Sequence, residues 1–160
     1  NERSQNSSIK LIVIHAISLP PKEYGGDYVE KFFLNKLKIS DHEYFKEIKD
    51  LKVSSHLYIK RDGEIIQFVP FNKRAWHAGE SSFNGEFDCN DFSIGIELEG
   101  SDCDKFTDHQ YQVLIDVTKQ LMNKYPDIKK NSIKGHSDIA PGRKTDPGDK
   151  FEWNRYLSKI

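Results

Sequence analysis

The apolar run from Ile9 to Ile14 constrains the fold of this chain more than any other feature. Its residues do not alternate between apolar and polar, so a strand there is expected to be buried on both faces. Its content of β-branched residues favours a strand over a turn of buried helix. A strand covered on both sides fits a central sheet, and this one carries His15 at its end.

Length and charge limit what the chain can be. With 160 residues, of which 36% are hydrophobic, we expect a single globular domain over residues 1–160. The formal net charge of −1 gives no overall field for a polyanion, so nucleic acid is not an expected partner. No apolar run approaches the ~20 residues of a membrane span, and no signal-peptide pattern opens the sequence. A monomer without membrane contact is the simplest expectation.

The cysteine content bears on the compartment. Cys89 and Cys103 are too few to staple a secreted domain of this length. We therefore expect reduced thiols in a cytoplasmic protein, with a single bridge between the two as the alternative.

Turn signals divide much of the chain into short strands. Asp62-Gly63 supplies the backbone angles of a tight two-residue turn, which predicts a β-hairpin. The polar residues 1–8 predict a terminus that is frayed or draped over the surface, and residues 79–90 predict a loop. Strands are predicted at 53–59, 64–69, 75–78, 93–98 and near residue 133.

Apolar residues at helical spacing predict one long helix and three short ones. Thr107 and Gln110 form a capping box that starts the long helix, and Tyr125-Pro126 ends it. Strands and helices without regular βαβ alternation predict an α/β domain with a central mixed sheet flanked by helices. The shorter helices are predicted at 28–37, 42–48 and 152–157.

Residues 16–51 form a long irregular excursion that opens with Pro20-Pro21 and Gly25-Gly26. Asp27 is expected to cap the short helix that follows these turns. Because long excursions in compact domains are often functional loops, we expect this one to move when substrate enters.

Three residues could hold a zinc ion. Zinc in a hydrolytic site takes about three protein ligands and leaves a position for water. His15 follows the buried strand, and His136 and Asp146 lie in the loop 135–148. Each also has an ordinary interpretation, because a strand-end histidine is often structural and an aspartate before proline often forms a turn. Their spacing is not a compact metal motif, so from the residues alone zinc stays a hypothesis.

Glu97 and Glu99 fall on one face of the strand predicted over 93–98, because side chains alternate along a strand. In the functional interpretation, one of them moves a proton from an attacking water to a leaving amine. In the structural interpretation, they line a solvated sheet face. Lys144 could aim a cation at a developing oxyanion or be an ordinary surface lysine.

Other residues could contact a ligand. Trp76 and His77 could offer an aromatic wall and hydrogen-bond donors to a sugar or peptide, although a lone tryptophan is more often a core residue. His56 is expected in the core, and His42 and His109 are expected at the surface. Five cations could gather at the mouth of the same site, or be solvated instead: Lys52, Arg61, Lys73, Arg74 and Arg143.

Six segments stand in the order of a known family, at 14–21, 61–65, 70–71, 73–79, 89–100 and 135–148. Together they resemble the AmpD-like branch of the zinc-dependent N-acetylmuramoyl-L-alanine amidases, which is related in fold to the peptidoglycan recognition proteins. The resemblance spans most of the chain, and several long motifs in order are more specific than any metal spacing.

The resemblance implies roles for five residues. In that family the matching positions bind zinc (His15, His136 and Asp146), act as acid and base (Glu97) and face the oxyanion (Lys144). It implies a cytoplasmic enzyme of peptidoglycan recycling that hydrolyses the amide between (anhydro)muramic acid and L-alanine in muropeptides. The alternative is a module that binds such fragments without cutting them, but relatives of that kind lose a ligand, and this chain has all three.

Three positions depart from the family pattern. Ala16 stands where asparagine is expected, Lys52 where arginine is usual, and Gly142 where aspartate is common. These departures leave the metal and acid/base positions unchanged and bear on how the substrate is bound. The residues expected to contact substrate are Trp76, His77, Arg143 and Lys52.

Overall fold

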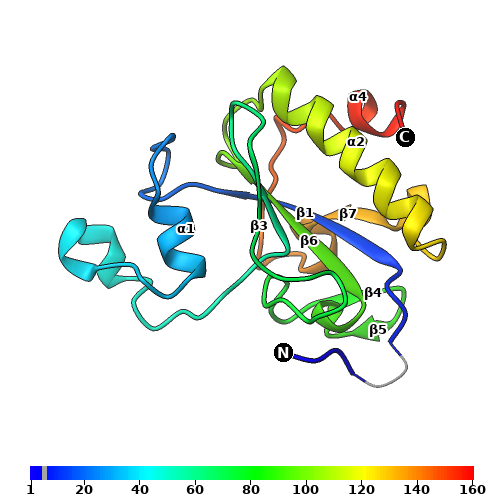
Figure 1. The fold of residues 1–160 in the computed structure, drawn as a ribbon, viewed down its shortest axis with the longest axis horizontal. Coiled ribbons are helices and arrows are strands. Elements are labelled where there is room, and N and C mark those ends of the chain that lie inside the picture. Colours follow the sequence, from blue (N-terminus) through cyan, green and yellow to red (C-terminus); the bar gives the residue numbers. More distant parts are fainter. Residues whose placement is uncertain (5–6) are drawn as a thin grey trace.

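The computed structural model describes residues 1–4 and 7–160. Within them, a five-stranded sheet of order β3-β2-β6-β1-β7 forms the centre of the molecule (Figure 1). β3 runs antiparallel to β2, and the other neighbouring strands are parallel, so the sheet is mixed as predicted. The strands are β1 (Leu11–Ile17), β2 (Leu57–Ile59), β3 (Ile65–Gln67), β6 (Ser93–Glu99) and β7 (Ile133–Gly135).

Helices flank this sheet. Figure 1 shows α2 and α4 together on one side of it, and α1 away from them. A separate small hairpin is formed by β4 (Ser82–Phe83) and β5 (Glu86–Phe87). The α-helices are α1 (Tyr28–Phe33), α2 (Asp108–Lys124), α3 (His136–Ile139) and α4 (Trp153–Leu157). Short 3-10 turns are η1 (Ile39–Asp41), η2 (Glu43–Lys46), η3 (Cys89–Asp91) and η4 (Lys130–Ser132).

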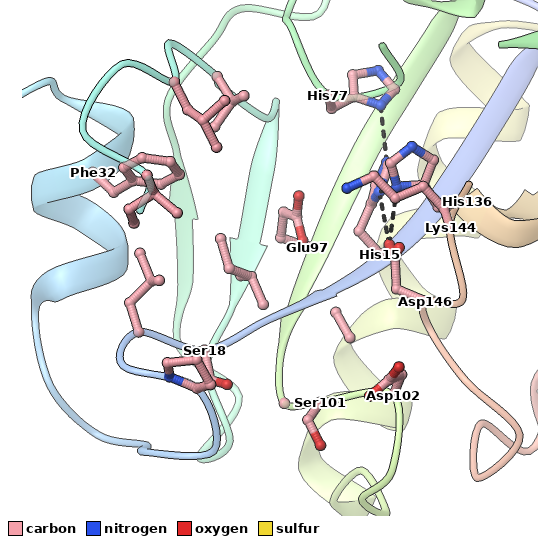
Figure 2. Close-up of a pocket in the computed structure, with 18 of the residues that line it drawn as sticks. His15, Ser18, Phe32, His77, Glu97, Ser101, Asp102, His136, Lys144 and Asp146 are labelled. Atoms are coloured by element: carbon pink, nitrogen blue, oxygen red, sulfur yellow. Dashed lines mark hydrogen bonds and ion pairs between the residues drawn. The ribbon is translucent and has the colours of Figure 1, made fainter. Parts of the chain in front are cut away.

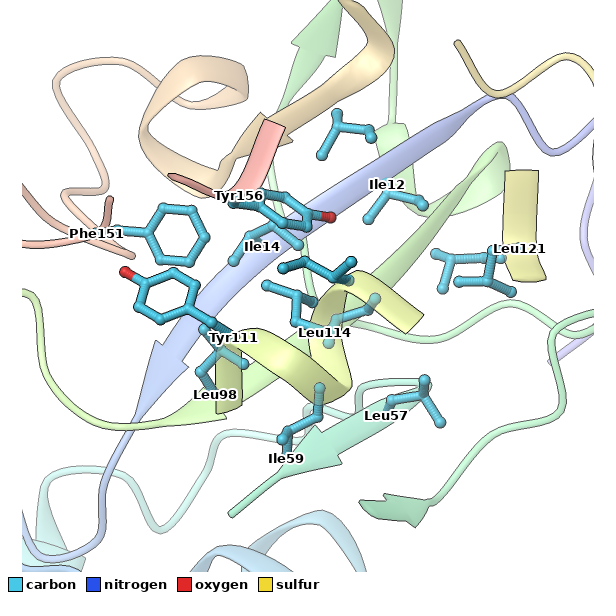
Figure 3. Close-up of a cluster of buried hydrophobic side chains, with 14 of the residues drawn as sticks. Ile12, Ile14, Leu57, Ile59, Leu98, Tyr111, Leu114, Leu121, Phe151 and Tyr156 are labelled. Carbon is cyan, nitrogen blue, oxygen red and sulfur yellow. The ribbon is translucent and has the colours of Figure 1, made fainter. Parts of the chain in front are cut away.

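The side chains of β1 alternate between two cores. Ile12 and Ile14 pack beneath α2 in the larger core, where Tyr156 of α4 also lies (Figure 3). Leu11 and Val13 point to the other face and pack in a second core. The strand is buried on both faces, which confirms the interpretation of its unbroken apolar run.

The capping box at the start of α2 is confirmed. Thr107 Oγ1 accepts from the Gln110 backbone N–H at 3.1 Å, and Gln110 Oε1 accepts from the Thr107 N–H at 3.0 Å. The Gln110 amide also donates to the carbonyls of Ile59 and Glu99, which ties the helix to two strands. The helix ends at Lys124, shortly before a proline that cannot continue it.

The predicted hairpin forms from β2 and β3, but its turn is longer than predicted. Lys60 donates its backbone N–H to the carbonyl of Glu64, which leaves three loop residues instead of two. Gly63 takes a φ of 92°, the left-handed conformation that closes a three-residue hairpin loop. Asp62 Oδ1 accepts from the Glu64 N–H at 2.9 Å and holds this turn.

The strand predicted over 75–78 is wrong. The backbone N–H groups of His77 and Ala78 both donate to Asn90 Oδ1, at 2.9 and 2.8 Å, so a side chain takes the place of a neighbouring strand. The predicted loop 79–90 contains the β4–β5 hairpin. Both differences come from contacts that no local pattern reports.

Of the two alternatives for residues 1–8, the terminus around Arg3 is held against the rest of the protein and is not frayed, and residues 5–6 lie outside the described part of the chain. The Arg3 guanidinium donates to the carbonyl oxygens of Phe71, Asp91 and Ser93 at 2.9 Å each. These three bonds anchor the terminus beside the start of β6.

The excursion 16–51 folds into α1, η1 and η2, in agreement with the short helices predicted there. Asp27 precedes α1, but its side chain makes no capping hydrogen bond and pairs with Lys31 at 2.8 Å instead. Elsewhere, Cys89 is a buried free thiol and Cys103 an exposed one.

Candidate active site

The sheet topology brings His15 and Glu97 together. They are register partners on the adjacent parallel strands β1 and β6, and both side chains point to the face opposite α2. His136 opens α3 directly after β7, the other neighbour of β1. Asp146 lies in the loop after α3, where Ser137 donates its N–H to the Asp146 carbonyl at 3.0 Å. The site therefore lies toward the carboxyl ends of three parallel strands.

Two histidines and one aspartate converge on a point in this site (Figure 2). The Nδ1 atoms of His15 and His136 are 3.0 Å apart, and each is 3.1 Å from Asp146 Oδ2. All the candidate ligand atoms lie within 4.8 Å of one another. The three residues form a group that could hold a metal ion.

The chemistry of the donor atoms fits a cation. His136 Nε2 lies 3.0 Å from the carbonyl oxygen of Ala78, which only accepts, so a neutral His136 carries its proton on Nε2. Its Nδ1 lone pair then faces the Asp146 carboxylate across 3.1 Å. Two electron-rich atoms this close need a cation between them, and two histidines with one carboxylate are a ligand set that zinc accepts.

Burial favours the neutral form of His15. It lowers the pKa of His15 to about 4, and the hydrogen bond to Asp146 offsets this only in part. Burial would raise the pKa of Asp146, but its close contacts with His136 and His15 outweigh this effect and hold that pKa below the usual range. At neutral pH His15 is therefore a neutral imidazole and Asp146 a carboxylate, which are the forms that metals bind.

Glu97 faces the same cavity from β6 (Figure 2). It is 8% exposed, and its Oε2 has no hydrogen-bond partner among the described residues. Burial raises its pKa well above that of an ordinary glutamate, the negative charge of Asp146 raises it further, and Lys144 opposes both effects. Glu99 is also buried, so the solvated-face interpretation of this strand is wrong.

A cavity of about 540 Å³ opens over these residues. The excursion supplies an apolar wall, and polar residues from two other loops line the opposite side. Ser101 and Asp102 line it too, and no motif singled them out in the sequence, whereas Ser18, which also lines it, lies in the family segment 14–21. The apolar wall from the excursion consists of Leu19, Phe32, Phe33, Tyr44, Ile48 and Leu51, and Val53 lies next to it.

The residues predicted to contact substrate occupy different places. Trp76 is 46% exposed at the cavity, where the Arg74 guanidinium stacks 4.1 Å from its ring centroid. Arg143 lines the cavity, and its Nη2 donates to the Ala78 carbonyl at 2.6 Å. His77 also lines the cavity but is 8% exposed. Lys52 lines a neighbouring hollow of about 220 Å³ instead.

Of the five cations that could gather at the mouth or be solvated, Arg143 alone is among the residues that line the cavity. Lys144, which was not among the five, lines it as well. Arg74 pairs with Asp88 and Asp91, at 2.7 and 2.6 Å. The Lys73 ammonium pairs with Glu2 at 2.5 Å, and the Arg61 guanidinium stacks on Tyr24.

The positions that depart from the family pattern also have structural settings. Ala16 follows His15 on β1 and lines the cavity. Gly142 takes a φ of 77° with open space around it, a backbone conformation that favours glycine over a residue with a side chain. His56 is fully buried and His109 is exposed, both as predicted, whereas His42, predicted at the surface, is partly buried.

The fold and the site together define a class. This mixed α/β domain has the parts of a metal-dependent hydrolase. It combines a group able to bind a metal with a buried carboxyl, and both lie beside an open cavity. Comparison with known proteins narrows this class. The sequence profile of the N-acetylmuramoyl-L-alanine amidases matches residues 5–149. The chain belongs to this amidase family.

Individual relatives agree. The chain is 53% identical to the 1,6-anhydro-N-acetylmuramyl-L-alanine amidase AmpD of Haemophilus influenzae over 160 residues, which are 100% of this chain and 87% of that protein. A crystal structure of a selenomethionine derivative of AmpD matches with a TM-score of 0.97 at 51% identity, covering 100% of this chain and 89% of that one. Escherichia coli AmiD, solved with anhydro-N-acetylmuramic acid-L-Ala-D-γ-Glu-L-Lys, matches with a TM-score of 0.71 at 30% identity, covering 99% and 61%.

Proposed function

We propose that this protein is a zinc-dependent amidase that hydrolyses the bond between (1,6-anhydro-)N-acetylmuramic acid and L-alanine in muropeptides, as a step of peptidoglycan recycling. The observation that carries the proposal is the convergence of His15, His136 and Asp146 on one point, with Glu97 on the next strand. The names of the relatives supply the substrate class.

His15, His136 and Asp146 would hold the zinc through two Nδ1 atoms and a carboxylate oxygen. Zinc in such a site makes a water acidic at neutral pH and polarises a carbonyl. Support for zinc over calcium or magnesium comes from the imidazole nitrogens, because those two cations take mostly oxygen ligands.

Glu97 is the proposed acid and base. Its buried carboxyl takes a proton from the attacking water and returns it to the amine of L-alanine as the amide bond breaks. Its raised pKa supports this role, because an acid/base group works best when both protonation states are accessible near the operating pH.

Lys144 is proposed to stabilise the oxyanion that forms from the amide carbonyl. It lines the cavity, and its positive charge acts on both His15 and Glu97. A fixed positive charge near the reacting carbonyl stabilises negative charge in the transition state more than in the substrate.

Substrate contacts are proposed for Trp76 and Arg143 at the cavity, and for His77 and Lys52 by the family resemblance. The volume of about 540 Å³ suits a fragment of a sugar and a short peptide. We propose that residues 1–160 form one amidase domain. This domain is monomeric and cytoplasmic and has no nucleic-acid or membrane partners. In the described part of the chain, no helix has the length and apolar character needed to cross a membrane.

A module that binds the fragment without cutting it is the second candidate. The complete set of candidate ligands and the buried Glu97 favour the enzyme over this module.

Incubation of the zinc-loaded protein with an anhydromuropeptide, followed by mass spectrometry, separates the two functions. The enzyme releases a free peptide that begins with L-alanine. Binding of the fragment without release at neutral pH would identify the module instead. The Glu97→Gln variant should bind the fragment and leave it intact, and Glu64→Gln, which changes an exposed glutamate on the hairpin, serves as the control.

A further inference from the structure

The segment His77-Ala78 contacts both histidines of the candidate metal site, His15 and His136. The backbone N–H groups of His77 and Ala78 donate to a single buried oxygen, Asn90 Oδ1. From this fixed position the Ala78 carbonyl accepts from His136 Nε2 at 3.0 Å, and His77 Nδ1 lies 2.9 Å from His15 Nε2. One segment therefore supplies the partner of each histidine.

The backbone carbonyl of Cys89 fixes which atom donates in each hydrogen bond around His77. Ser93 Oγ lies 2.5 Å from the backbone oxygen of Cys89, and because a carbonyl only accepts, the hydroxyl proton points there. Ser93 Oγ then accepts from His77 Nε2, which lies 3.1 Å away. A neutral imidazole protonated on Nε2 has its lone pair on Nδ1. His15 must therefore donate from its own Nε2.

This chain of bonds leaves His15 Nδ1 unprotonated and facing the point where His136 Nδ1 and Asp146 Oδ2 converge. We propose that His77 is a positioning residue that holds His15 in the Nε2-protonated tautomer, so that Nδ1 is free to bind the metal. The proposal rests on the zinc site proposed above and gives His77 a role other than substrate contact.

The strand β6 makes room for the His77 ring. A Cβ added at Gly95 would lie 2.4 Å from His77 Cγ and 2.6 Å from His77 Nδ1, closer than any real contact. The ring occupies the space that a side chain at this position would fill. With Ser93 on the same strand and His15 on the next, the ring is held by packing as well as by its two nitrogens.

A hydrogen-bond partner of a metal-bound histidine orients the ring and fixes its tautomer. Loss of such a partner typically weakens metal binding about 10–100-fold. The usual partner is a carboxylate, a carbonyl or a water. In this protein the partner of His15 is a second neutral imidazole, that of His77, and Ser93 sets the orientation of the His77 ring.

Zinc affinity, measured by competition with a chelator in the full-length protein, tests the proposal. His77→Ala should bind zinc about 10–100-fold more weakly. His77→Asn, whose amide oxygen can lie near the position of Nδ1, should recover most of the affinity, because it restores an acceptor for His15. Ser93→Ala should weaken binding less than His77→Ala does.

Ser55→Ala is the matched control for Ser93→Ala. Ser55 is a buried serine whose hydroxyl donates to the backbone carbonyls of Leu57 and Gly95, so its hydrogen bonds go to neither His15 nor His77. The Ser55→Ala variant should bind zinc with the affinity of the unaltered protein. Equal zinc affinity in His77→Ala, His77→Asn and the unaltered protein would overturn the proposal.

A spectroscopic readout on the unaltered, zinc-loaded protein does not depend on the folding of any variant. Long-range ¹H–¹⁵N spectra report which ring nitrogen carries the proton, and both His15 and His77 should be protonated on Nε2. A proton on Nδ1 of His77 would overturn the proposal. Failure of the unaltered protein to bind zinc would overturn the metal assignment as well, whereas tight zinc binding with the wrong His77 tautomer overturns this inference alone.

Discussion

His15 and Glu97 are register partners on the two central parallel strands, and both point away from α2 into one cavity. Neighbouring strands lie about 4.8 Å apart, so this pairing keeps the proposed base close to the proposed ligand without any loop between them. The backbone hydrogen bonds of the sheet fix the relative position of the two groups. Residues built on strands hold such geometry better than residues on loops.

Replacing Glu97 tests the proposed proton transfer. Glu97→Gln keeps the shape of the side chain but cannot exchange a proton, so turnover of an anhydromuropeptide should fall by about 100-fold or more. Zinc content and fragment affinity should stay near those of the unaltered protein, because the residue is not a proposed ligand. Turnover within a few-fold of normal would contradict the role given to Glu97.

Zinc binding should stabilise the fold. A ligand at 100 times its Kd stabilises the state that binds it by about 2.7 kcal/mol, so added zinc should raise the melting temperature, and a chelator should reverse the shift. Asp146→Asn and His136→Ala should lose most of this zinc-dependent shift. A shift of equal size in these variants, measured by differential scanning calorimetry, would mean that zinc binds elsewhere.

The excursion 16–51 should open and close over the cavity. It supplies the apolar wall, and its first part is held to the rest of the protein through Gly25, whose N–H donates to Glu99 at 2.5 Å, and through Tyr24, whose hydroxyl donates to Asp104. Amide hydrogen exchange over residues 28–51 should be faster than in β1 and should slow when an anhydromuropeptide binds. Exchange as slow as that of β1, with and without ligand, would argue against a moving wall.

The core between α2 and the sheet should dominate stability. Leu114 is fully buried there (Figure 3), so Leu114→Ala should lower the free energy of unfolding by about 2–5 kcal/mol. Leu34 is 51% exposed, and Leu34→Ala should change it by no more than about 0.5 kcal/mol. Urea denaturation of both variants checks the difference, and equal effects would contradict the assignment of the core.

Local patterns predicted much of this fold. The unbroken apolar run of β1 and the capping box at Thr107 each depend on residues close in sequence, and both are confirmed. The pattern around 75–78 failed because a distant side chain, Asn90, takes the backbone hydrogen bonds that a neighbouring strand would have supplied. The hairpin turn was misjudged in length, since the Asp-Gly pair also suits a three-residue loop closed by Gly63.

The candidate site was only partly predictable. Residue types and family resemblance singled out His15, His136 and Asp146, and the structure brings them within 4.8 Å. The contacts around His77 could not be predicted, because they depend on the register of β6 and on the room left by Gly95. The sequence left the placement of the five cations open for a similar reason: Arg74 has acidic partners that its neighbours in sequence do not reveal.

Metal analysis paired with mass spectrometry of a muropeptide digest tests the central claim most directly. The unaltered protein should contain one zinc per chain and release L-alanine-terminated peptide from an anhydromuropeptide, and His15→Ala should lose both the metal and the release. Zinc retained and peptide released by His15→Ala would contradict the assignment of His15, His136 and Asp146 as the metal site of an amidase.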